Sequence, residues 1–150
     1  MHLIDSLKTH NIIKTGDFTL KSGQKSTIYC DFKSVITYPK LMSDICYELS
    51  KLITSEGALC GVPMGAISFG TLISYIMQRP MILLRETRKE YGTCNLIEGK
   101  CEGKVILIED VITTSQSVIE CIELLKQENI EVTQIICILD RQTGGVQRLQ

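Results

Sequence analysis

Residues 105–117 read VILIEDVITTSQS and decide the fold. Four apolar residues are followed by two acids, Glu109 and Asp110, then by two more apolar residues and a run of hydroxyl side chains. A continuous run of Val, Ile and Leu predicts a strand that is buried on both faces. Serine and threonine before the next segment predict the start of a helix. The stretch is therefore typical of a strand, loop and helix in an α/β protein.

Outward from this stretch, apolar runs of strand length alternate with helical patterns. Pro39 suits the first position of one of the helices. The expected strands are 58–62, 80–84, 105–108 and 132–139, and the expected helices are 41–53, 65–77 and 117–128. Alternation of this kind predicts a mostly parallel sheet with helices on either side.

Two regions fall outside the alternation. Residues 18–30 predict two extended pieces around a glycine-containing turn, preceded by a short helix near 3–12. Residues 85–104 carry three glycines and many charges, and a segment of that length inside a compact domain is usually a functional loop or disordered. The expected organisation is one domain over 1–150, with a hood at about 1–36, a core at about 39–150 and a mobile loop at about 86–103.

Composition excludes several classes of protein. Sixteen basic and 17 acidic residues give a formal net charge of -1, which does not suit nucleic-acid binding. No apolar run approaches the roughly 20 residues of a membrane span, and the N-terminus lacks the positive region of a signal peptide. Seven cysteines, an odd number without a CxxC pair, favour reduced buried thiols over disulfides. We expect a soluble cytoplasmic protein, with no membrane partner and no structural metal.

The loop after the central strand is suited to an anion. Ligands of open parallel sheets bind beyond the carboxyl ends of strands, where Glu109 and Asp110 lie. The amides of the next turn and the dipole of the helix can hold a phosphate, to which the hydroxyl side chains add donors. The alternative is a solvated strand end followed by an ordinary helix cap. Neither GxxxxGK[ST] nor GxGxxG occurs in the chain.

Residues 105–117 resemble the ribose-phosphate signature of the type I phosphoribosyltransferases, which favours the phosphate interpretation. Blocks elsewhere resemble orotate phosphoribosyltransferase, in the style of the first domain of eukaryotic UMP synthase. The blocks are FTLKSG at 18–23 with Ser26 and Tyr29, GVP at 61–63, Arg85 with KEYGT at 89–93, IEG at 97–99, and DRQ at 140–142 with Gly144 and Gly145. Several blocks in the right order are more specific than any one of them alone.

This resemblance implies a fold, a reaction and partners. The fold is the type I phosphoribosyltransferase fold with a small N-terminal hood, and the sheet is expected to lack the last strand because the chain ends shortly after Arg141. The reaction is transfer of the ribose 5-phosphate of 5-phosphoribosyl 1-diphosphate (PRPP) to orotate, giving orotidine 5'-monophosphate and diphosphate in UMP synthesis. Magnesium is carried mainly by the diphosphate, with no metal site of the protein's own, and the enzyme is a homodimer.

Residue roles follow by position in the resemblance. Glu109 and Asp110 face the ribose hydroxyls, and Lys89 is the main catalytic cation. The 5-phosphate is held by Thr113, Thr114, Ser115, Gln116 and Ser117, with Thr113 also near orotate. The remaining substrate contacts are Lys21 and Tyr29 under the hood, Arg141 on orotate, and Arg85, Arg88 and Tyr91 with the loop that reaches the neighbouring subunit's diphosphate.

Three positions depart from the family pattern. Glu86 stands where a diphosphate-binding lysine is usual, and Arg88 could substitute for it. Ser115 replaces a glycine, which adds strain if that residue has a positive φ. Met64 replaces a common tyrosine. Two alternatives therefore stay open beside the active enzyme: a catalytically impaired relative that binds nucleotide or a partner, and a transferase for another base.

Overall fold

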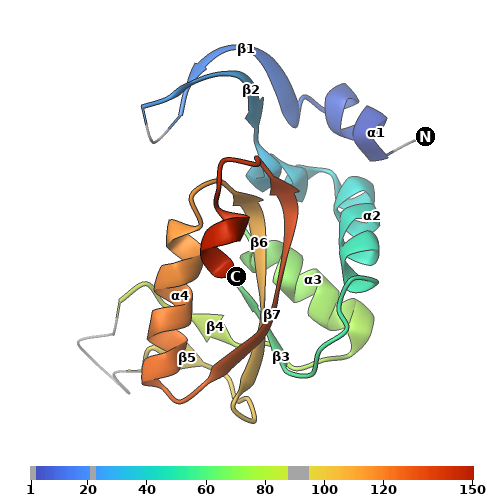
Figure 1. Cartoon of the computed structure of the whole chain (residues 1–150). Coiled ribbons are helices and arrows are strands. Elements are labelled where there is room, and N and C mark those ends of the chain that lie inside the picture. The colour runs from blue at the N-terminus through green and yellow to red at the C-terminus, as the bar shows by residue number, and fades with distance from the viewer. Residues whose placement is uncertain (1–2, 21–22, 88–94) are drawn as a thin grey trace. The chain divides into compact units, whose positions relative to one another are not determined.

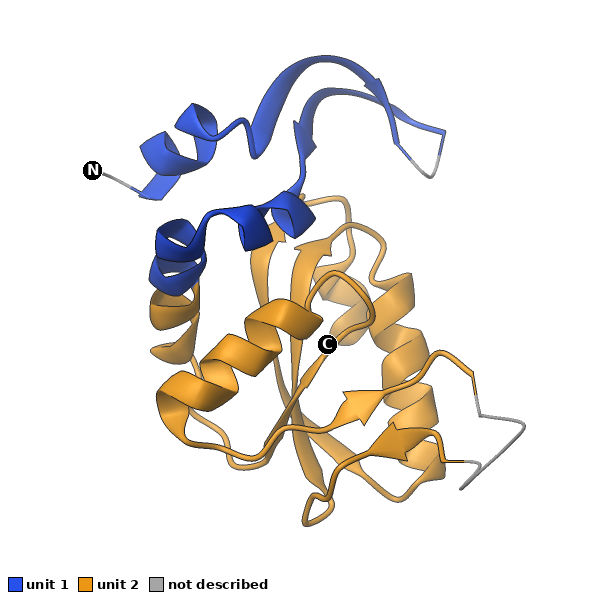
Figure 2. Ribbon diagram, turned by 180° about the vertical axis from the view of Figure 1, so that it is seen from behind, with its two compact units in different colours: residues 1–45 blue, residues 46–150 orange. Residues whose placement is uncertain are grey.

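The computed structural model describes residues 3–20, 23–87 and 95–150. The chain divides into two compact units, residues 1–45 and 46–150, which are coloured separately in Figure 2. The first unit holds α1 (Leu3–Thr9), β1 (Ile13–Thr19), β2 (Lys25–Cys30) and the 3-10 helix η1 (Phe32–Thr37), and α2 (Pro39–Ser50) crosses into the second. The second holds β3 (Ala58–Gly61), α3 (Ile67–Met77), β4 (Leu83–Leu84), β5 (Ile97–Glu98), β6 (Lys104–Ile112), α4 (Gln116–Gln127), β7 (Glu131–Asp140) and the 3-10 helix η2 (Val146–Leu149).

The second unit is built on a parallel sheet in the order β3-β6-β7, with β6 at its centre. A parallel bridge from Leu59 to Met81 joins the chain before β4 to the outer side of β3. Helices α3 and α4 lie on opposite sides of this sheet (Figure 1). The predicted α/β fold, a parallel sheet flanked by helices, is confirmed.

Burial explains why residues 105–108 are apolar without interruption. All four are fully buried. Successive side chains of a strand point to opposite faces, and Val105 and Leu107 share one core with Val118, Cys121 and Leu125 of α4. The alternate residues face the other side, so both faces of β6 are covered and neither tolerates a polar side chain.

Two predicted boundaries differ from the observed ones. Strand β6 runs to Ile112 and so includes both acids, because β7 pairs with it as far as Ile112 and Asp140. The run 80–84 forms only the two-residue β4, which pairs antiparallel with β5 inside the segment expected to be a loop. Gly99 follows this pair with φ +95, and a Cβ there would lie 3.1 Å from the carbonyl oxygen of Met81. Short strands of this kind have no periodicity to recognise.

The first unit contains the predicted pair of extended segments. Strands β1 and β2 form an antiparallel hairpin from Ile13 opposite Cys30 to Thr19 opposite Lys25. The amide of Leu20 donates to the carbonyl of Gln24 at 2.9 Å and closes the turn. Among the described residues, no helix is long and apolar enough to cross a membrane.

Candidate active site

The loop that joins β6 to α4 is the centre of the candidate site. It leaves the carboxyl end of the central strand and passes directly into α4, so its amides and the helix N-terminus lie together. Ser115 is the N-cap residue of α4 and adopts a left-handed conformation, with φ 63° and ψ 15°. The strain expected for a serine in place of glycine is therefore present, because this residue has a positive φ. For a residue other than glycine the cost is about 1–2 kcal/mol.

Gly145 packs against the underside of this loop. A Cβ atom on Gly145 would lie 2.3 Å from the carbonyl oxygen of Thr113, and 2.8 Å from both Cγ2 of Ile112 and Oγ of Ser115. Only glycine fits such an approach. The Ser115 hydroxyl is buried and has no hydrogen-bond partner among the described residues, so its position is set by packing.

The two acids lie among the last four residues of β6, which continues past them to Ile112. Glu109 is only 6% exposed, whereas Asp110 is half-buried. The amide of Asp110 donates to Oε1 of Glu109 at 2.9 Å, and the amide of Val111 donates to Oδ1 of Asp110 at 2.8 Å. A Cβ on Gly65 would lie 2.4 Å from Oδ2 of Asp110, so a side chain at position 65 would displace this carboxylate from its present place.

Arg141 is brought next to the loop by the pairing of β7 with β6. Its amide donates to the carbonyl of Ile112 at 3.0 Å. The hydroxyl of Thr143 donates to the carbonyl of Thr113 at 2.8 Å. The structure thus places Arg141, the two acids and the loop at the same end of the sheet, although 30 residues of chain separate Thr113 from Thr143.

Gln116 and Arg148 meet at the start of α4. One guanidinium nitrogen of Arg148, Nη1, donates to the carbonyl of Thr114 at 2.5 Å, and Nη2 donates to Oε1 of Gln116 at 3.3 Å. The amide nitrogen of Gln116 donates to Glu120 at 2.9 Å. The sequence patterns did not indicate Arg148, Thr143 or Gly65, because contacts 30 or more residues away along the chain leave no local pattern.

Arg85 follows β4 and is paired with Glu98 of β5. Its Nε and Nη2 both donate to Oε1 of Glu98, at 3.1 and 2.8 Å. Both side chains are more than one third exposed. The sequence patterns did not predict this partner of Arg85. Glu86 is exposed, and the predicted residues Arg88, Lys89 and Tyr91 lie outside the described residues.

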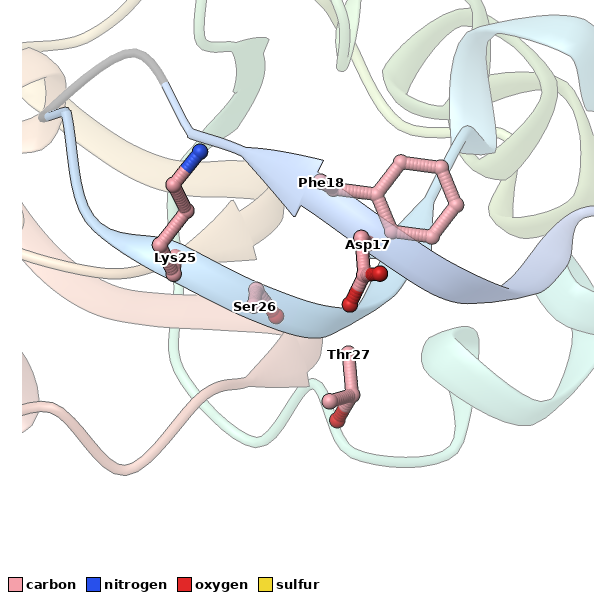
Figure 3. Close-up of a pocket in the computed structure, with 5 residues that line it drawn as sticks. All are labelled: Asp17, Phe18, Lys25, Ser26 and Thr27. Carbon is pink, nitrogen blue, oxygen red and sulfur yellow. The ribbon is translucent and has the colours of Figure 1, made fainter.

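The remaining predicted contacts belong to the first unit. Tyr29 is 41% exposed in β2, and its ring centroid lies 5.6 Å from that of Phe18. Lys21 lies outside the described residues. Around this hairpin is a hollow of about 410 Å³ (Figure 3). It is lined by Asp17, Phe18, Lys25, Ser26 and Thr27.

The thiols of the buried cysteines are unreactive at neutral pH. Burial raises the pKa of each of the thiols of Cys46, Cys60 and Cys121 to about 12. A thiol protonated at neutral pH is neither a good nucleophile nor a metal ligand. These residues therefore serve the core and not the site.

No protein-family model matches the chain. Named relatives do. The chain is 36% identical to the orotate phosphoribosyltransferase of Methanospirillum hungatei, over 99% of this chain and 87% of the relative. It is also 36% identical to the orotate phosphoribosyltransferase of Caenorhabditis elegans, over 97% of this chain but only 66% of that protein's length.

Solved structures give the same fold. The UMP synthase of Leishmania donovani matches with a TM-score of 0.84 and 30% identity, over 98% of this chain and 33% of that one. The orotate phosphoribosyltransferase of Aeropyrum pernix matches with a TM-score of 0.78 and 24% identity, over 99% and 87%. The predicted phosphoribosyltransferase fold is confirmed.

Proposed function

The chain belongs to the orotate phosphoribosyltransferase family, and we propose that it transfers the ribose 5-phosphate of PRPP to orotate, giving orotidine 5'-monophosphate and diphosphate for UMP synthesis. One observation carries this proposal. The loop 113–117 follows the two acids of the central strand, separated from them by Val111 and Ile112, and opens a helix, with a left-handed residue at its bend. A ribose 5-phosphate needs this combination of phosphate donors and hydroxyl acceptors.

The loop is proposed to hold the 5-phosphate. Its donors are the hydroxyls and amides of Thr113, Thr114 and Ser117, with the amides of Ser115 and Gln116 at the helix N-terminus. The side chain of Gln116 is already bound to Arg148 and Glu120. Its contribution to the phosphate is therefore proposed to come from its backbone.

Glu109 and Asp110 are proposed to accept hydrogen bonds from the ribose hydroxyls. The bond from the anomeric carbon to diphosphate breaks with development of positive charge on the sugar, and carboxylates beside the sugar stabilise that charge. Because Gly65 has no side chain, the Asp110 carboxylate can lie close to its backbone. Arg141 is proposed to pair with the orotate carboxylate, for which a guanidinium fork is well shaped, and Lys21 and Tyr29 are proposed to complete the base site.

The diphosphate is proposed to meet the loop cations and magnesium. Lys89 would be the main cation, with Arg85, Arg88 and Tyr91 beside it. Mg²⁺ is commonly bound through substrate phosphates, and it is proposed to be carried mainly by the diphosphate. When bound, the ion neutralises charge on the departing diphosphate.

A homodimer in the cytoplasm completes the proposal, with the loop of one subunit serving the site of the other. Mixing two inactive variants, Lys89→Ala and Arg141→Ala, tests the sharing of the loop. Mixed dimers then hold one site with both original residues, so activity should return on mixing. A dimer that stays inactive after subunit exchange would place both residues in one subunit's site.

The test of the reaction is orotate consumption, followed by its ultraviolet absorbance. Orotate should disappear only when PRPP and magnesium are both present, and Lys89→Ala should abolish turnover without unfolding the protein. Lys126→Ala, which removes an exposed cation at the far end of α4, is the matched control. A panel of other bases tests the alternative of a different acceptor.

Two observations favour a second candidate, an impaired relative that binds nucleotide or a partner. Ser115 has the left-handed conformation that glycine adopts without cost. Glu86 is exposed where the family usually has a diphosphate-binding lysine. Binding of PRPP without any consumption of orotate would select this candidate.

A further inference from the structure

Three consecutive carbonyl oxygens, those of the last residue of β6 and of the first two residues of the phosphate loop, accept hydrogen bonds from the C-terminal segment, residues 141–148. The donors are the amide of Arg141 to Ile112 (3.0 Å), the hydroxyl of Thr143 to Thr113 (2.8 Å) and the guanidinium of Arg148 to Thr114 (2.5 Å). Figure 1 shows η2, which carries Arg148, beside the start of α4. The C-terminal segment therefore binds the backbone of the chain from the end of β6 to Thr114.

The geometry of the peptide bond gives this arrangement a consequence. In a planar trans peptide the N–H points away from the C=O of the preceding residue. The amides of Thr113, Thr114 and Ser115 therefore point away from the C-terminal segment. Among the described residues, the backbone hydrogen bonds outside helices and strands include none donated by these three amides. Successive amides aimed the same way form an anion-binding concavity.

Arg148 differs from the other two donors because its side chain reaches two parts of the loop. It binds the carbonyl of Thr114, the last before the left-handed Ser115, and the side chain of Gln116, the first residue of α4. A guanidinium presents its donors in a fixed plane, whereas a lysine ammonium is a single point. Arg148 thus ties together the two ends of the bend.

We propose that Arg148 is a positioning residue for the 5-phosphate loop, holding the Thr114 carbonyl so that the amide of Ser115 faces the phosphate. This inference rests on the proposed function, since it needs the loop to bind a phosphate. A charged donor also polarises the peptide that it binds, which strengthens the N–H on the other side.

The experiment compares four proteins by calorimetric titration with ribose 5-phosphate and, separately, with orotate. They are the wild type, Arg148→Ala, Arg148→Lys and the control Lys126→Ala. Arg148→Ala should weaken ribose 5-phosphate binding about tenfold, the size expected for one charge-assisted hydrogen bond. Orotate binding should not change. Arg148→Lys should recover part of the loss, and Lys126→Ala should bind as the wild type does.

The outcomes separate this inference from the function on which it rests. A wild type that binds no ribose 5-phosphate overturns both. A wild type that binds it, with Arg148→Ala binding equally well, overturns the inference alone. Equal losses in Arg148→Ala and Lys126→Ala overturn it too, because they indicate general attraction by charge.

A second variant tests, without any change of charge, whether the hydrogen bonds from residues 141–148 position the phosphate loop. Thr143→Val removes the hydrogen bond to the carbonyl of Thr113 and keeps the shape of the side chain. It should weaken ribose 5-phosphate binding in the same direction, by less than Arg148→Ala. If Arg148→Ala does not fold, Thr143→Val provides the test. Wild-type affinity for ribose 5-phosphate in that variant would show that hydrogen bonds from the C-terminal segment do not position the loop.

Discussion

The Ser115 hydroxyl lies 2.8 Å from the point at which a Cβ atom on Gly145 would stand. The two residues are far apart in the sequence, yet each limits the other: Gly145 cannot carry a side chain, and Ser115 is buried against it. Since Ser115 forms the bend of the proposed phosphate loop, this contact couples the loop to the end of the described chain.

Ser115→Gly should raise the free energy of unfolding by about 1 kcal/mol. Glycine adopts the left-handed conformation of residue 115 without the steric cost borne by serine, although it also gains freedom in the unfolded chain. Urea denaturation measures the change. Ser117→Gly is the control, because the same replacement inside α4 should lower stability by a few tenths of a kcal/mol. A loss of stability in Ser115→Gly would contradict the strain argument.

Gly145→Ala should lower the free energy of unfolding by about 2–3 kcal/mol, as overpacking does. The new methyl group would meet the carbonyl oxygen of Thr113, which is backbone and cannot turn aside. Ribose 5-phosphate binding should weaken in parallel. Gly144→Ala is the control, since φ there is +91° but nothing lies within 4 Å of the added Cβ. It should cost about 1 kcal/mol through the backbone alone and leave binding unchanged.

Glu98→Gln should raise the KM for PRPP while changing stability by less than about 1 kcal/mol. The ion pair with Arg85 is more than one third exposed and therefore contributes little to folding, but it orients a proposed diphosphate ligand. Steady-state kinetics and thermal melting measure the two effects. Glu56→Gln, which removes the exposed partner of Lys104, should alter neither. An unchanged KM in Glu98→Gln would show that Arg85 needs no orienting partner.

Cys46, Cys60 and Cys121 should resist alkylation by iodoacetamide in the native protein near neutral pH, whereas part-exposed Cys101 should react faster than these three. Burial raises the pKa of the Cys46, Cys60 and Cys121 thiols to about 12. Peptide mass spectrometry after timed labelling measures this. Labelling of the three thiols at the rate of Cys101 would contradict their burial.

The same thiols predict how stability changes with pH. Because the folded pKa lies above the unfolded one, their stabilising contribution is complete below about pH 8.5 and is lost as the pH rises toward 12. Denaturation curves between about pH 9 and pH 11 should show this fall. Cys60→Ala should show a shallower fall than the wild type, and an identical slope would rule out a contribution from this thiol.

Local patterns were sufficient for much of the fold. Four apolar residues followed by two acids, two more apolar residues and a hydroxyl run predicted a strand, a loop and a helix at 105–117, and the structure has β6 and α4 there. Apolar runs are readable because a strand covered on both faces must be apolar at every position. Strand β5 was missed because two residues carry no period, and it exists only through its pairing with β4.

The sequence by itself determined the α/β alternation, the position of the proposed phosphate loop and the identity of the acids before it, since each depends on neighbours in the chain. Only the tertiary structure decided that Ser115 is left-handed, that Gly145 must lack a side chain, and that Arg148 reaches Thr114. The physical reason is the pairing of β6 with β7, which brings residues 141–148 beside the loop. No residue near the loop in the sequence indicates that residues 141–148 lie beside it.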